Sequence, residues 1–177
     1  LYIEEVNFND HKSDEQGGVL YMSDVNQTRI TWCHFENSIA KQNGGSLFFF
    51  GTKSSFVVFL KGCNFSNTVA FQQAGSVKVV QVSALLLVDV KFVDSVSQYR
   101  DGGSMFVENI KHFKMNNVQF RHSSAQISRG GALYVSNVEL MVMENAIVFS
   151  NLAGQDGGAV LVADVVSLNI NKSWIVH

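Results

Sequence analysis

The residues of this chain that could do chemistry are mainly its acids, and they are scattered along the sequence. Asp10 and Asp14 lie in an early polar segment, while Asp101 and Asp156 each precede a glycine pair, a position typical of turn formers. Asp89 follows an apolar run and is the best candidate for an acid that faces a groove. Cleavage of a glycosidic bond needs two carboxylates about 5–10 Å apart, and no second acid accompanies Asp89. We therefore predict no catalytic residues and a protein that is not an enzyme.

The two cysteines, Cys33 and Cys63, are the next candidates, but no histidine or third cysteine accompanies them in the pattern. We therefore predict no metal ligands and no cofactor. Three Asn-X-Ser/Thr sequons begin at Asn26, Asn64 and Asn171 and are candidates for N-glycosylation. Chance alone gives about two, so their number carries no weight. Asn64 stands between two apolar residues and is expected to face outward.

The elements that position these residues follow a strict period. Glycines, usually the second of a pair, recur at Gly18, Gly45, Gly75, Gly103, Gly131 and Gly158. Phenylalanines that end an apolar run recur at Phe8, Phe35, Phe65, Phe92, Phe120 and Phe149. Both markers return every 27–30 residues, so the whole chain is read as one repeat array.

Each repeat contains three short apolar runs separated by polar corners, a pattern typical of strands rather than helices. We predict an all-β fold, a single right-handed parallel β-helix over residues 1–177, with about six coils of 27–30 residues and three strands per coil. A β-propeller is the alternative, but its blades need four strands and about 40 residues. Proline is absent, in keeping with strands that all donate to a ladder.

Stacked coils bring equivalent residues into columns. The phenylalanines are expected to form one inward column, so Phe120 should be buried. A second inward column of small apolar residues is expected two positions earlier, at Val6, Cys33, Cys63, Val90, Val118 and Ile147. Cys33 and Cys63 are neighbours in it, and we keep both a disulfide and a pair of stacked thiols as interpretations, with thiols favoured because parallel Cβ vectors suit a disulfide poorly.

A further column breaks the inside-outside rule. Three residues after the glycine stand Tyr21, Phe48, Lys78, Phe106, Tyr134 and Leu161, and alternation along the strand turns them outward. We call Tyr21, Phe48, Phe106 and Tyr134 the outer stripe and expect it to be exposed. It is interpreted either as a structural stack or as a docking face for a neighbouring rod, another domain or glycans.

The repeat starts GGALY (130–134), GGAV (157–160) and GGSMF (102–106), together with the ends FSN (149–151), FSN (65–67) and FEN (35–37), resemble a known repeat. They are similar to the GGA[ILV]/FxxN repeats of polymorphic outer-membrane autotransporter passengers and of pectin-lyase-like surface proteins of protists. The resemblance implies a secreted or surface-exposed, non-catalytic adhesive or structural module.

Charge and chain ends complete the expectations. The net charge of −2 gives no case for nucleic acid, and the apolar runs are too short for membrane insertion. Neither end shows a cap, so we expect further coils or further copies to cover both ends. We predict an extracellular or cell-surface scaffold that assembles end to end. The alternative is a polysaccharide-active β-helix enzyme, or a carbohydrate-binding fragment of one.

Overall fold

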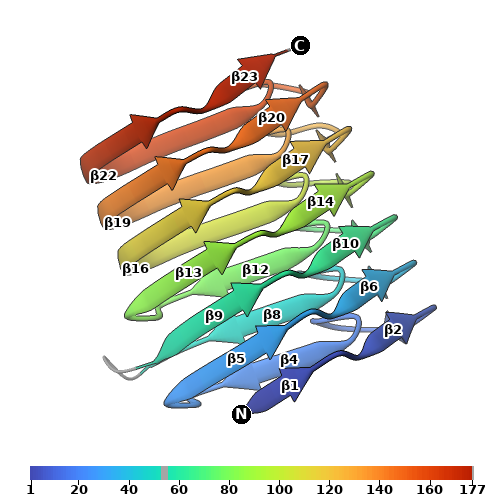
Figure 1. The fold of residues 1–177 in the computed structure, drawn as a ribbon. Helices are drawn as coiled ribbons and strands as arrows, with labels where there is room; N and C mark the ends of the chain where they lie inside the picture. The colour runs from blue at the N-terminus through green and yellow to red at the C-terminus, as the bar shows by residue number, and fades with distance from the viewer. Residues whose placement is uncertain (53–55, 177) are drawn as a thin grey trace.

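Each sequence repeat forms one coil of a parallel β-helix, and about six coils stack from the N-terminus to the C-terminus (Figure 1). The computed structural model describes residues 1–52 and 56–176. All strand pairs in that part of the chain are parallel, and each joins one coil to the next. The predicted all-β solenoid is therefore confirmed.

The largest sheet contains the first two apolar runs of every coil and has ten strands. The run after the glycines forms β4 (Leu20–Ser23), β8 (Leu47–Phe50) and β12 (Val77–Val80). The second run forms β1 (Tyr2–Glu4), β5 (Gln27–Thr31), β9 (Val57–Lys61) and β13 (Ala84–Val88). In the last three coils both runs join into one bent strand, namely β16 (Met105–Asn116), β19 (Leu133–Glu144) and β22 (Val160–Asn171).

The second sheet carries the phenylalanine run. Its seven strands are β2 (Asn7–Asn9), β6 (His34–Glu36), β10 (Asn64–Ser66), β14 (Lys91–Val93), β17 (Gln119–Arg121), β20 (Ile147–Phe149) and β23 (Trp174–Val176). Four of its phenylalanine pairs stack nearly face to face, from Phe8–Phe35 to Phe92–Phe120. The buried positions predicted for Val118 and Phe120 are confirmed, and Gln119 between them is half-buried.

The third sheet lies in the polar segment between the phenylalanine run and the next glycine pair. Six two-residue strands pair there: β3 (Lys12–Ser13), β7 (Ile39–Ala40), β11 (Val69–Ala70), β15 (Val96–Ser97), β18 (Ser124–Ala125) and β21 (Leu152–Ala153). Their inward residues are small, which closes the coil tightly.

The sixth position of the two inward columns was predicted wrongly. Val148, not Phe149, pairs with Phe120, and Ile147 pairs with Gln119. Ala146 therefore takes the small inward position, and Phe149 is turned outward and is 41% exposed. Val148 and Phe149 are adjacent in the sequence. Val148 follows Phe120 by 28 residues and keeps the register of the preceding coil, whereas Phe149 follows it by 29.

Corners between strands require left-handed backbone. The corner after the second run has φ of 48–63° in every coil and is occupied by Glu5, Trp32, Gly62, Asp89, Asn117, Asn145 and Lys172, which we call the corner column. Asn, Asp and Gly suit this conformation because their short or absent side chains avoid the clash with the following carbonyl. The bulky side chain of a tryptophan does not suit it.

Candidate functional site

The outer stripe stacks on the outside of the largest sheet, separate from the main core. Phe106 and Tyr134 lie face to face with centroids 4.9 Å apart, and Tyr21 meets Phe48 at 5.3 Å. Between them, Nζ of Lys78 lies 5.1 Å from the ring centroid of Phe48 and 5.3 Å from that of Phe106. The stripe is therefore continuous, as alternation along the strands predicts.

Its exposure was predicted wrongly. Tyr21 is 52% exposed, but Phe48, Phe106 and Tyr134 are each at most 9% exposed. The loop that precedes each glycine pair folds over them, and Ala74 packs in the same small apolar cluster. The stripe thus stabilises the loops, and only Tyr21 retains a large accessible surface.

Loop side chains complete this cover. Nζ of Lys78 donates a hydrogen bond to Oε1 of Gln73 over 2.7 Å. The guanidinium of Arg129 lies 5.3 Å from the ring centroid of Tyr134. Burial lowers the pKa of Lys78 to about 8, although the nearby carboxylate of Glu108 acts in the opposite direction. The half-buried amine of Lys78 therefore loses its proton at a lower pH than an exposed lysine does.

The two cysteines are not joined to each other in the structure, and their surroundings favour the interpretation as stacked thiols. Cys33 and Cys63 are neighbours in adjacent coils, both are buried, and Sγ of each contacts backbone carbonyl oxygens, at 3.3 Å from Thr31 and 3.4 Å from Lys61. Burial raises the pKa of Cys33, and it raises the pKa of Cys63 to about 11. Both behave as small apolar residues of the core.

The sequon asparagines all reach the outer surface. Asn26 and Asn171 are exposed, and Asn64 is half-buried in β10 between the buried Cys63 and Phe65. Its outward orientation is as expected.

The acids are distributed over separate parts of the rod. Asp14 pairs with Lys41 at 2.6 Å on an exposed turn, whereas Asp101 is buried and binds Ser128 and Arg129 of the next coil. Oδ1 of Asp89 accepts a hydrogen bond from Nδ2 of Asn117 over 2.7 Å. In residues 1–52 and 56–176, no three His, Cys, Asp or Glu side chains gather closely enough to hold a metal ion.

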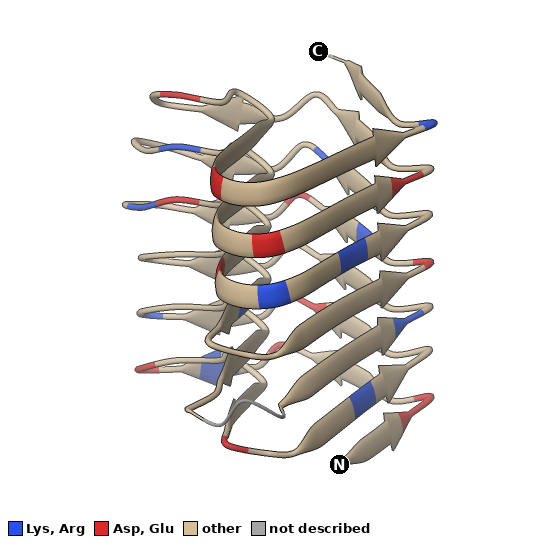
Figure 2. Ribbon diagram, turned by 90° about the vertical axis from the view of Figure 1, so that its left-hand side faces the viewer, with Lys and Arg blue, Asp and Glu red and all other residues tan. Residues whose placement is uncertain are grey.

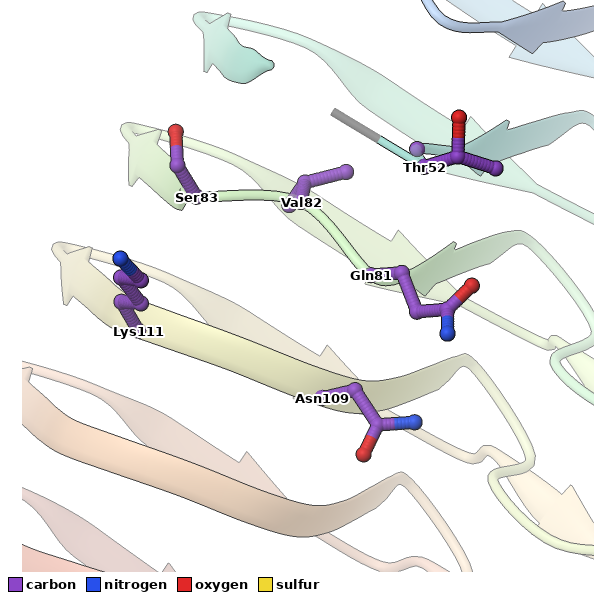
Figure 3. Close-up of a pocket in the computed structure, with 7 residues that line it drawn as sticks. Thr52, Gln81, Val82, Ser83, Asn109 and Lys111 are labelled. Carbon is purple, nitrogen blue, oxygen red and sulfur yellow. The ribbon is translucent and has the colours of Figure 1, made fainter. Parts of the chain in front are cut away.

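Figure 3 shows a depression at the bend of the largest sheet. Its volume is about 330 Å³, and Gly51, Thr52, Gln81, Val82, Ser83, Asn109 and Lys111 line it. Thr52 donates to Oδ1 of Asp24, Ser83 donates to the carbonyl oxygen of Phe56, and Asn109 accepts from Asn137. These groups hold coils together, so we assign the depression no chemistry.

Charged residues of both signs are spread over turns and strands, with no broad patch of one sign on the face shown in Figure 2. Within the described residues, no helix has the length and apolar character needed to cross a membrane. Neither a protein-family profile, nor a curated protein, nor a solved structure matches this sequence.

Proposed function

We propose that the chain is a non-catalytic structural or adhesive scaffold of an extracellular or cell-surface protein, extended at both ends by further coils or by further copies of itself. The extracellular location rests on the resemblance of its GGA-type repeats to those of surface proteins. The extension by further coils or copies rests on the second glycine of each glycine pair.

One observation carries the proposal. The second glycine of each pair has no room for a Cβ, because that atom would collide with the carbonyl oxygen of the equivalent glycine in the next coil. This holds for Gly18, Gly45, Gly75, Gly103 and Gly131. Gly158 keeps the same residue type, yet a Cβ there would meet no other atom of residues 1–52 and 56–176 within 4 Å. A coil seated on Gly158 would give this glycine the role that the other five have.

The two end coils support the same proposal. Among the described residues, β22 and β23 have a ladder partner on one side only, as do β1, β2 and β4 at the other end. Apolar side chains are exposed at the C-terminal end, with Val166 at 85%, Trp174 at 70% and Ile175 at 52%. Unpaired strands with apolar faces are templates for adding another strand, and a head-to-tail contact that does not close on itself generates a filament.

Gly158→Ala tests this extension. Residues 1–177 should associate end to end in sedimentation velocity experiments, and Gly158→Ala should weaken this association without changing circular dichroism or thermal unfolding. Gly103→Ala is the matched control, because its Cβ would collide with backbone of Gly131 and Ser124 inside the rod. It should lower stability itself. A wild-type segment that stays a stable monomer at all concentrations would overturn the proposal.

A further inference from the structure

Trp32 is the residue that least suits its place in the corner column. Its φ is 57°, a left-handed conformation that is a genuine outlier for a bulky side chain. Such strain is of the order of 1–3 kcal/mol and persists where the surroundings or a function require it. Burial does not explain it, because Trp32 is 48% exposed.

The next coil is built to receive this indole. Gly62 follows Trp32 in the corner column, and a Cβ on Gly62 would collide with the six-membered ring of Trp32. Nζ of Lys61 lies 5.6 Å from the ring centroid. The indole is thus held in one orientation against backbone while about half of its surface stays open to solvent.

A depression of about 410 Å³ opens beside this ring. Its volume falls within the range of about 300–1,000 Å³ that is usual for small-molecule sites. The lining residues come from four successive coils and are Trp32, His34, Gly62, Cys63, Asn64, Asp89, Lys91 and Asn117. His34, Asn64 and Lys91 are in register in β6, β10 and β14, so their side chains form one outward row beside the corner column.

The polar groups of the depression are oriented. Asn117 donates to Oδ1 of Asp89, which fixes both side chains. Within the described residues, the other carboxylate oxygen of Asp89 accepts no hydrogen bond and is available to a ligand hydroxyl. Asp89 and Lys91 carry opposite charges, so together they give the site no net charge that would select an anion or a cation.

We infer that Trp32, Asn64, Asp89 and Lys91 form a binding site for a neutral saccharide ring. A pyranose has an apolar face that packs on an aromatic ring, and a rim of hydroxyl groups that a carboxylate, an amide and an ammonium group can hydrogen-bond. An exposed aromatic wall with a few fixed polar groups provides both. One carboxylate holds a sugar but does not supply the pair that cleavage needs. The site does not depend on the end-to-end extension.

The sugar has two sources with the same chemistry. Asn64 lines the depression and is also the acceptor of the sequon Asn64-Phe65-Ser66. The ring on Trp32 is therefore either the first residue of a glycan attached to Asn64 or part of a free glycan. Production with and without N-glycosylation separates the two.

The first arm uses unglycosylated protein. The chain has two tryptophans, so Trp174→Phe leaves Trp32 as the only indole fluorophore. Titration with neutral cello-, chito- and galacto-oligosaccharides should give a saturable change in its emission. Direct binding, followed by calorimetry, should weaken by about tenfold or more in Trp32→Asn and in Gly62→Asn, whose side chain would displace the indole. Asn suits the left-handed corner, so both variants should fold.

The second arm uses protein from a eukaryotic secretory host. If Asn64 carries a glycan, its enzymatic removal should change the emission of Trp32, and Asn64→Gln should reproduce the change. Tyr99→Ser, at a tyrosine that is 59% exposed on a loop, is the control and should alter neither arm. A saturable titration in the first arm, or an emission change on glycan removal in the second, supports the site and identifies the source. Folded protein with no response in both arms would overturn the inference.

Discussion

The ring of Phe92 lies on the ring of Phe120 with centroids 4.9 Å apart and planes inclined by 6°. Both rings are fully buried, and each belongs to a different coil. The contact therefore holds two repeats together through side chains, in addition to the backbone ladder between β14 and β17.

Phe120→Ala should lower the free energy of unfolding by about 3–5 kcal/mol, because it removes a buried ring and leaves a cavity between coils. Phe149→Ala is the matched control, since Phe149 is 41% exposed and lies outside the stack of buried phenylalanine rings. It should change stability by less than about 1 kcal/mol. Denaturant unfolding of both variants measures the difference, and equal losses would contradict the observed register.

Asp101→Ala should destabilise the chain by about 2–3 kcal/mol. Oδ1 of Asp101 accepts hydrogen bonds from Oγ of Ser128 at 2.6 Å and from the backbone nitrogen of Arg129 at 3.1 Å, and both carboxylate oxygens bind the guanidinium. Asp14→Ala removes the exposed pair with Lys41 and should change stability by about 0–1 kcal/mol. Urea unfolding of the two variants should separate them clearly; a similar effect would mean that the inter-coil contacts of Asp101 contribute little.

Lys78 should make stability depend on pH. Its pKa of about 8 in the folded chain is below the ordinary value of about 10.4. Below pH 8 both states hold the proton, and the folded state bears the full penalty of burying the charge. As pH rises through this window, the folded state releases its proton first, so the folded state gains stability, by about 1–2 kcal/mol after allowance for partial exposure.

The comparison of wild type with Lys78→Met isolates this contribution, since other titrating groups, including Cys63, are present in both. The stability of wild type relative to Lys78→Met should rise between about pH 8 and 10.4. Lys111→Met, at an exposed lysine of β16, is the control for losing a lysine charge. A difference between wild type and Lys78→Met that does not vary with pH would show that Lys78 keeps its proton.

Cys33 and Cys63 should resist thiol reagents in the native state. Both side chains are buried, and the raised pKa of Cys63 keeps its reactive thiolate scarce. Reaction with a chromogenic disulfide reagent should be slow in buffer and should titrate two thiols in denaturant. Rapid labelling of the folded chain, or an intact mass lower by two hydrogens, would contradict two buried thiols.

The sequence was sufficient to predict the period, the strand class and most of the core. Stacked coils require a glycine and an inward apolar residue at equivalent positions, so both recur along the sequence. It failed where two neighbouring residues satisfy the same pattern. Val148 and Phe149 are both apolar, and only pairing with Phe120 and Arg121 distinguishes them. The residue with left-handed backbone after β20 is accordingly Ser150, with φ of 52°. Asn151 turns inward, and its Oδ1 accepts a hydrogen bond from the backbone nitrogen of Ser123.

The exposure of the outer stripe was also predicted wrongly, for a different reason. Alternation along a strand shows that Phe48 and Tyr134 leave the main core, but it cannot show that a loop covers them. Their cover depends on residues of the preceding loops, such as Ala74 and Arg129, whose approach is a tertiary contact. The sequence did not predict the binding site inferred at Trp32 for a related reason. The orientation of this indole depends on its contact with Gly62 in the next coil, which is a tertiary contact.

The ladders that join the coils also determine how the molecule responds to force. Their hydrogen bonds run from one coil to the next, along the axis of the rod (Figure 1). A pull on the two chain termini therefore opens one ladder at a time, and the coil at the loaded end peels away while the others stay wound. Each released coil of about 28 residues adds a contour length of about 90–100 Å, at about 3.3–3.6 Å per residue. The rod should yield in even steps and lengthen many times over before it comes apart.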